Sequence, residues 1–405
     1  MHRWLTLTVG TLLALLAALG GIGTPAAVAT RTAAGAYAVT EIPTLGGKTS
    51  SAFDLNNAGQ VVGRADAADG ASHAYRWSAG QLVDLGTLGG KTSDTSAIND
   101  RGQVAGWSQI GGGGDEHAFL WDGGTMTDLG TLGGTISRSV RLNTAGQVAG
   151  LATTAPGQKV GDPGMHPVLW DGGKPTDLGT LGGSLGRANG LNEAGQVVGF
   201  ATTAGEVPHA FLWERGQMTD LGTLPGAQAS YGIRINRAGQ VIGWAADASN
   251  AQATRRAFRY AGGRMTELGT LGGAYSEAYG LNDVGQVVGW SQVGGGPAAP
   301  AHAWLWDNGR LTDLNDLLPA GSGWVLTNAT GINDAGQIVG VGTLNGQQRG
   351  FLLTPAAMPG LPNTGGGGMR ARTAFPAGVA VLALVALVAQ SATRARCRRR
   401  PVDAR

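Results

Sequence analysis

The chain repeats one short signature, Asn-x-x-Gly-Gln, along most of its length. The copies begin at Asn56, Asn99, Asn143, Asn192, Asn236, Asn282 and Asn333. Successive copies are separated by 43, 44, 49, 44, 46 and 51 residues, which matches the size of one β-propeller blade. A single four-stranded sheet with apolar residues on both faces cannot bury them alone, so neighbouring repeats must stack. The spacing therefore predicts an all-β ring of blades.

Each repeat has room for four short strands separated by turn residues. The best example predicts strands over residues 95–98, 103–107, 117–121 and 126–132. Asn99 opens the first hairpin, and Gly102 follows at a position where a tight turn favours positive φ. Small residues such as Ser96 and Ala97 occupy the first strand, which suits the crowded position near a propeller axis.

The last repeat lacks its fourth strand, and a matching segment stands at the other end of the repeat region. Residues 41–47 align without gaps on residues 84–90, which form the fourth strand and following loop of another repeat. An N-terminal strand that completes the last blade closes the ring and leaves no open edge. We predict a seven-bladed β-propeller of four-stranded blades over residues 37–354, closed by this N-terminal strand.

The N-terminal 29 residues have the pattern of a secretory signal peptide. Arg3 precedes an apolar run, and Ala27 and Ala29 stand at the small-residue positions before Thr30, where cleavage is expected. Residues 30–36 are predicted to be a leader.

The C-terminal segments predict a membrane span after a short linker. Residues 355–373 form the linker, and residues 374–392 are 19 mostly apolar residues, enough to cross a hydrocarbon core as a helix. Five arginines at residues 394–400 predict that the tail, residues 393–405, stays on the cytoplasmic side. The single cysteine, Cys397, lies in this tail, so no disulfide is expected in the exported body.

Charge disfavours a nucleic-acid or anionic-membrane partner for the exported body. Residues 30–364 contain 20 Lys and Arg against 26 Asp and Glu, a net charge of −6. We expect membrane contact only through residues 374–392 before processing, and a monomer.

Five histidines recur at one repeat position and predict a structural role. They are His73, His117, His166, His209 and His302. Equivalent positions in adjacent blades cannot converge on one zinc at a ligand distance of about 2.1 Å. We expect each imidazole to hydrogen-bond an acid on the adjacent fourth strand, at Asp84, Asp128, Asp177, Asp220 and Asp313. No catalytic residues, metal ligands or cofactor motif are predicted.

The loops between second and third strands vary most, and they predict a recognition face. The candidate ligand residues near this face are Trp107, Trp244, Trp290, Asp115 and Glu116. Core packing for the tryptophans and solvated loop charge for the acids remain the alternatives. A second tryptophan set recurs at a fixed repeat position and predicts inter-blade core: Trp77, Trp121, Trp170, Trp213 and Trp306.

The segment Leu361-Pro362-Asn363-Thr364-Gly365, followed by an apolar segment and a basic tail, resembles the LPXTG cell-wall sorting signal of Gram-positive surface proteins. The resemblance implies that a sortase cuts between Thr364 and Gly365 and joins Thr364 to peptidoglycan. The protein is then expected to be secreted and anchored to the wall of a Gram-positive-type bacterium.

The repeats resemble the HAF family of bacterial extracellular repeats, named for the His-Ala-Phe found here at residues 117–119 and 209–211. Residues 166–168, 256–258 and 349–351 depart from that triplet. The resemblance implies an extracytoplasmic location and a propeller, and it carries no established activity.

The leading functional hypothesis is a wall-anchored, non-enzymatic binding or adhesion module for a polysaccharide or protein partner. The alternatives are an extracellular glycan hydrolase or lyase on a propeller scaffold, since fold does not determine function, and a purely structural envelope protein.

Overall fold

The computed structural model describes residues 36–111, 114–247, 254–296 and 299–356. The predicted signal peptide with Ala27, Ala29 and Thr30, the sorting motif 361–365, the apolar segment 374–392 and the basic tail 393–405 lie outside these residues. In the described ranges, no helix has the length and apolar character needed to cross a bilayer.

The strands of the first four repeats form four antiparallel sheets of four strands, each ordered by sequence from the inner edge outward. The first two contain β2 (Gly46–Leu55), β3 (Val61–Ala67), β4 (Ser72–Ser78) and β5 (Gln81–Asp84), then β6 (Gly89–Ile98), β7 (Val104–Ile110), β8 (Glu116–Asp122) and β9 (Thr125–Asp128). The next two contain β10 (Ser137–Leu142), β11 (Val148–Thr153), β12 (Met165–Asp171) and β13 (Lys174–Asp177), then β14 (Gly182–Leu191), β15 (Val197–Thr203), β16 (Pro208–Glu214) and β17 (Gln217–Asp220).

The C-terminal half continues the same order. One parallel pair, Arg255 with Tyr275, joins eight strands into one sheet: β18 (Ala229–Ile235), β19 (Val241–Ala246), β20 (Arg255–Ala261), β21 (Arg264–Glu267), β22 (Gly272–Leu281), β23 (Val287–Val293), β24 (Ala301–Asp307) and β25 (Arg310–Asp313). A short 3-10 helix, η1 (Leu314–Leu317), leads to the last strands: β26 (Trp324–Ile332), β27 (Ile338–Leu344) and β28 (Gln347–Pro355).

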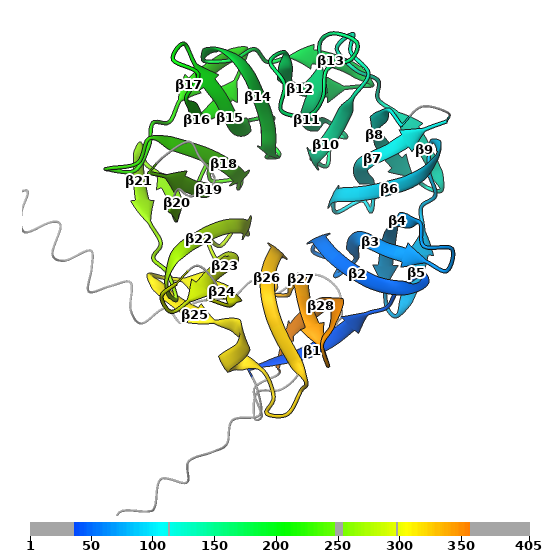
Figure 1. The fold of residues 1–405 in the computed structure, drawn as a ribbon, viewed down its shortest axis with the longest axis vertical. Helices are drawn as coiled ribbons and strands as arrows, with labels where there is room; N and C mark the ends of the chain where they lie inside the picture. Colours follow the sequence, from blue (N-terminus) through cyan, green and yellow to red (C-terminus); the bar gives the residue numbers. More distant parts are fainter. Residues whose placement is uncertain (1–35, 112–113, 248–253, 297–298, 357–405) are drawn as a thin grey trace, which may run out of the picture. The chain divides into compact units, whose positions relative to one another are not determined.

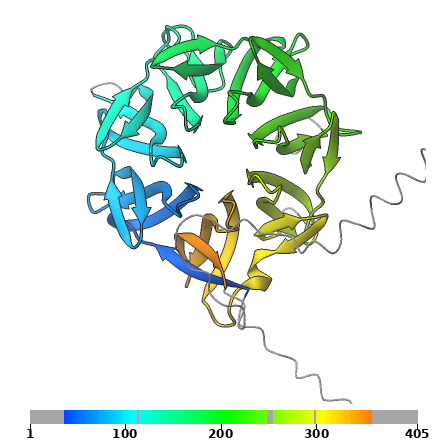
Figure 2. The ribbon, with the colours of Figure 1, turned by 180° about the vertical axis from the view of Figure 1, so that it is seen from behind.

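The sheets stand radially around a common axis, which makes the described body a β-propeller (Figures 1 and 2). The strands nearest the axis are β2, β6, β10, β14, β18, β22 and β26. The core lies between adjacent sheets: Val62 and Ala74 of one sheet pack with Phe119 and Trp121 of the next. Of the five tryptophans at the repeated position, Trp77, Trp121 and Trp170 are buried, while Trp213 and Trp306 are partly buried and pack against the core.

The N-terminal strand completes the sheet of the last repeat. β1 (Tyr37–Ile42) pairs antiparallel with β28, with Glu41 opposite Phe351 and Ile42 opposite Gly350. Ile42 is fully buried. This register confirms the predicted pairing of the two ends of the repeat region.

The Asn-x-x-Gly-Gln signature has a structural explanation at two levels. Within a turn, the Asn99 side-chain oxygen accepts from the backbone N–H of Arg101 and Gln103, and Gly102 adopts a φ of 80°. Between sheets, Asn99 Nδ2 donates to the backbone carbonyl of Asn143. The same bond recurs along a closed circle through Asn56, Asn99, Asn143, Asn192, Asn236, Asn282 and Asn333, which donates back to Asn56.

Each inner strand carries a β-bulge that shapes the channel. In β6 the register with β7 shifts between Thr95 and Ala97, and equivalent shifts occur in the other inner strands. The second strand keeps a glycine opposite this region: a Cβ on Gly106 would lie 2.0 Å from the Asp94 carbonyl oxygen. The glycine lets the inner strand approach closely and turn its side chains to the axis.

The two largest differences from the predicted strand boundaries lie in the fourth and first strands of the example repeat. The fourth strand of the example repeat ends at Asp128 and does not continue to residue 132, because the Asp128 carboxylate accepts from the backbone N–H of Gly130, which turns the chain at a φ of 68°. The first strand begins at Gly89, six residues earlier than predicted. It starts earlier because Gly89 pairs with Ile110 in β7.

The five predicted histidine contacts are confirmed. The Nδ1 atoms of His73, His117, His166, His209 and His302 lie 2.6 to 2.8 Å from the carboxylates of Asp84, Asp128, Asp177, Asp220 and Asp313. Each pair ties the third strand to the end of the fourth strand of the same sheet.

Candidate functional site

An ion cluster crosses the central channel. Asp54 on β2 pairs with Arg141 on β10 at 3.3 Å and with Arg234 on β18 at 3.2 Å. Arg141 also donates to the Ser96 carbonyl, and Arg234 donates to the carbonyls of Tyr279 and Thr330. Burial raises the pKa of the Asp54 carboxyl, and Arg234 opposes that shift. The cluster joins six inner strands. The residues just before its three ions line one pocket (Phe53, Val140 and Ile233), and the residues just after them line another (Leu55, Leu142 and Ile235).

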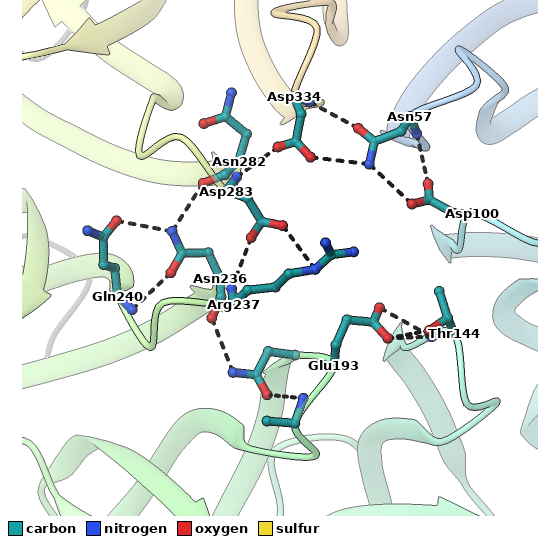
Figure 3. Close-up of polar contacts among 12 residues, drawn as sticks. Asn57, Asp100, Thr144, Glu193, Asn236, Arg237, Gln240, Asn282, Asp283 and Asp334 are labelled. Atoms are coloured by element: carbon teal, nitrogen blue, oxygen red, sulfur yellow. Dashed lines mark hydrogen bonds and ion pairs between the residues drawn. The ribbon is translucent and has the colours of Figure 1, made fainter. Parts of the chain in front are cut away.

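The pocket at the turn end is small, about 170 Å³, and its polar groups already have partners. Asp283 accepts from the Arg237 backbone N–H and pairs with the Arg237 guanidinium at 3.1 Å (Figure 3). Asp334 accepts from Asn57 Nδ2 and from the Asp283 backbone N–H. These acids connect adjacent turns, so we assign this end a structural role.

The pocket on the other side of the cluster, here the channel cavity, measures about 580 Å³, within the range of small-molecule sites. Its lining is aromatic, charged and polar: Phe53, Asp94, Thr95, Ser96, Trp107, Val140, Arg141, Arg187, Asn189, Phe200, Tyr231, Ile233, Trp244, Arg255, Glu277, Tyr279, Asn328 and Thr330.

One inner-strand position contributes five of the aromatic, charged and polar residues that line the channel cavity. Four residues before the end of each inner strand, the chain has Ser51, Asp94, Arg138, Arg187, Tyr231, Glu277 and Asn328. The preceding position is Ser50, Ser93, Ser137, Ser230 or Ser276 in five copies. The Ser93 and Ser137 hydroxyls each accept from a backbone N–H of the preceding sheet. The serine stabilises the scaffold. Its neighbour takes six residue types in the seven repeats, with arginine twice, and lines the cavity in five of them.

The Trp244 ring contacts an aromatic residue, Tyr231, and a cationic residue, Arg255. Tyr231 stacks on it with ring centroids 4.0 Å apart and planes 22° apart. The Arg255 guanidinium carbon lies 5.0 Å from the Trp244 ring centroid, and Arg255 pairs with Glu277 of the next repeat. Glu277 also accepts from the Tyr279 hydroxyl.

The same arrangement recurs around Trp107 with the two charges exchanged. Arg138 lies over the Trp107 ring, 4.5 Å from its centroid, and pairs with Glu116. The acid and the arginine are 22 residues apart in both cases, at equivalent repeat positions. In one pair the arginine comes from the sheet of the tryptophan, and in the other it comes from the next sheet.

Asp94 is the cavity carboxyl with the most perturbed titration. Burial raises its pKa to about 7, although Arg64 lies 3.3 Å away and opposes the shift. Its Oδ1 atom is buried without a hydrogen-bond partner among the described residues. Near neutral pH this carboxyl therefore exists in both protonation states and can donate or accept a hydrogen bond.

No family model and no curated protein matches the chain. Solved structures resemble it only distantly. The propeller domain of the trilobed protease of Pyrococcus furiosus has a TM-score of 0.49 and 11% identity, covering 76% of this chain and 97% of that one. The Aleuria aurantia lectin has a TM-score of 0.39 and 13% identity, covering 69% and 100%. A gluconolactonase of Xanthomonas campestris has 0.36 and 12%, covering 82% and 93%. These likenesses are too distant to support any function.

The structure separates the five candidate ligand residues. Trp107 and Trp244 line the channel cavity. Glu116 forms an ion pair with Arg138. Trp290 lies opposite Glu277 in the register of β22 and β23. Asp115 does not line the cavity; its backbone carbonyl accepts from the Ile110 N–H in the loop.

Sequence reasoning missed the residues that give the cavity its character, among them Arg187, Tyr231, Glu277 and Tyr279. They lie on inner strands rather than on the variable loops. Among the described residues, no group of three or more His, Cys, Asp or Glu side chains is placed to hold a metal ion.

Proposed function

We propose that this protein is an exported, wall-anchored β-propeller that binds a glycan in the channel cavity without chemically altering it. The proposed body has seven blades. Two facts support that number: the eight-stranded sheet is two four-stranded units joined at one pair, and the asparagine circle passes through seven turns.

Export and anchoring rest on the terminal segments. The signal-peptide pattern of residues 1–29 and the LPXTG-like motif at 361–365 support secretion followed by sortase attachment of Thr364 to peptidoglycan. The likeness of the repeats to HAF repeats supports the same extracytoplasmic location.

The observation that carries the binding proposal is the contrast between a regular scaffold and an irregular cavity. Tyr231, Trp244 and Tyr279 contribute aromatic surface, and Asn189, Asn328 and Asp94 contribute polar groups beside it. Aromatic rings next to amide and carboxyl groups suit sugar rings, which present apolar C–H faces and hydroxyl edges.

A cavity-filling variant tests the proposal. Asn328 lines the cavity and its Oδ1 has no partner, so Asn328→Trp blocks space without breaking a side-chain hydrogen bond seen in the described residues. We expect the full-length protein to retain one class of glycan on an array of wall and extracellular polysaccharides, and Asn328→Trp to lose it. Ala145→Trp, on an exposed turn at the opposite end, is the matched control. Binding that survives Asn328→Trp, or an array that stays blank, contradicts the proposal.

One observation favours a glycan hydrolase as the second candidate. A carboxyl with a pKa near 7 is what a general acid needs at neutral pH, and Asp94 has that property. The other cavity acid, Glu277, is held by Arg255 and Tyr279, which leaves no free carboxylate as the second catalytic group. Release of reducing ends from the retained glycan, abolished by Asp94→Asn, would replace the binding proposal with this one.

A further inference from the structure

Arg187 differs from the other two arginines that line the channel cavity. Arg141 pairs with Asp54, and Arg255 pairs with Glu277. Arg187 takes part in none of the ion pairs among the described residues. Its Nε atom is buried and, like that of Arg141, has no hydrogen-bond partner in the part of the chain that the structure describes.

The surroundings of Arg187 keep it charged but uncompensated. It projects from the inner strand β14, opposite Phe200 of β15. Burial lowers the pKa of its guanidinium, and nearby Arg138 lowers it further. Arginine nevertheless stays protonated in proteins, so this is a partly buried cation without a carboxylate. Burying an unpaired charge costs free energy, and a position that retains one points to a bound anion.

From this contrast we propose that Arg187 is an anion subsite of the channel cavity and that the glycan bound there carries a carboxylate, as in a uronic acid. The assignment rests on the proposed glycan-binding function. The planar guanidinium suits a carboxylate, with which it forms two parallel hydrogen bonds. Phe200 and Tyr231, whose rings meet edge to face at 5.0 Å, offer apolar surface beside it.

The other free polar atoms of the cavity fit the rest of such a sugar. Asp94 Oδ1 and Asn328 Oδ1 are both buried without partners in the described ranges, and both can accept hydrogen bonds from hydroxyl groups. Arg187, Asp94 and Asn328 come from three different sheets. A single sugar ring in the cavity can therefore place its carboxylate against Arg187 and its hydroxyl groups against Asp94 and Asn328.

The test compares D-glucuronate, its uncharged methyl ester and D-glucose by calorimetry with the full-length protein. We expect glucuronate to bind at least tenfold more tightly than either uncharged sugar. Arg187→Gln should bring the three affinities within about twofold of one another. Arg101→Gln, on an exposed turn at the far end, should leave the preference unchanged. The ester comparison requires no change in the protein, so it stays decisive if the Arg187 variant does not fold.

Three results overturn the assignment. Equal affinity for glucuronate and its ester in the wild type shows that the protein does not recognise the carboxylate charge. A tenfold preference for glucuronate that persists in Arg187→Gln shows that residues other than Arg187 recognise the carboxylate. Tighter binding of inorganic phosphate than of glucuronate assigns the subsite to phosphorylated ligands instead. If neutral sugars bind and Asn328→Trp removes that binding, the glycan proposal stands without the acidic one; if no sugar binds and the array is blank, both fail.

Discussion

Asp54 and Arg234 are 180 residues apart in the chain, and their side chains meet across the central channel at 3.2 Å. Arg141 reaches the same carboxylate from a third sheet. A charge cluster of this kind forms only when the sheets that contribute to it stand around one axis. It therefore depends on the assembled ring, and one of its members, Arg141, lines the channel cavity.

We expect Asp54→Asn to lower the free energy of unfolding by about 3–5 kcal/mol, because it leaves two largely buried arginines without their anion. Urea unfolding measures this change. Asp69→Asn, at an exposed loop carboxylate, should stay within about 0.5 kcal/mol of the wild type. A similarly small effect of Asp54→Asn would show that the cluster does not stabilise the ring.

Asn143→Ala tests the asparagine circle. The Asn143 side chain accepts from the Gln147 N–H and donates to the Asn192 carbonyl. Its removal leaves the partly buried Gln147 N–H without this acceptor and the Asn192 carbonyl with only the Gly195 N–H as donor. We expect a loss of about 1–3 kcal/mol in urea unfolding. Ala145→Ser changes an exposed residue of the same turn and should have little effect. Equal stability of the two variants would contradict a structural role for the signature.

Ile42→Ala tests the closing strand. Ile42 is fully buried where β1 meets β28, so its truncation should cost about 2–5 kcal/mol. Thr40→Ala, at an exposed position of the same strand, is the control and should change stability by less than about 1 kcal/mol. Thermal unfolding that is unaffected by Ile42→Ala would mean that β1 does not dock as described.

Asp94 predicts a specific dependence of stability on pH. The folded protein holds the Asp94 proton more tightly than the unfolded chain, because burial raises its pKa from 3.8 to about 7. The stability contributed by this group is therefore present in full below pH 3.8 and is lost as the pH rises through 7.

Asp94→Asn removes that dependence. The variant should gain stability relative to the wild type between pH 4 and pH 8, by on the order of 4 kcal/mol at most. Urea unfolding of both proteins at each pH measures the difference. A difference that is constant with pH would show that the Asp94 pKa is not raised.

The spacing and alignment of the repeats predicted the arrangement of the strands, because the residues that stabilise this arrangement recur in each repeat. Asn99 keeps its place in each copy since one side chain caps a turn and reaches the next sheet. His117 recurs for a similar reason, through Asp128. The pairing of residues 41–42 with the last repeat followed from the same alignment, because a missing strand must be supplied from elsewhere.

The cavity was not predictable in the same way. Arg187 and Glu277 occupy an inner-strand position whose residue type varies among the repeats. The sequence-based prediction placed the variable positions in the loops and so did not include this one. Comparison of the residues that follow the repeated inner-strand serine could have found Asp94, Tyr231 and Glu277. Their distances and partners depend on how the sheets are arranged around the axis, which the spacing of repeats does not specify.

The most direct test of the binding site is an indole N–H NMR spectrum of the full-length protein, recorded with and without a soluble fragment of the glycan retained on the array. The account predicts that the signals of Trp107 and Trp244, which line the channel cavity, shift on binding, while those of the core residues Trp77 and Trp170 do not. Shifts confined to tryptophans outside the cavity, with Trp107 and Trp244 unchanged at saturation, would contradict it.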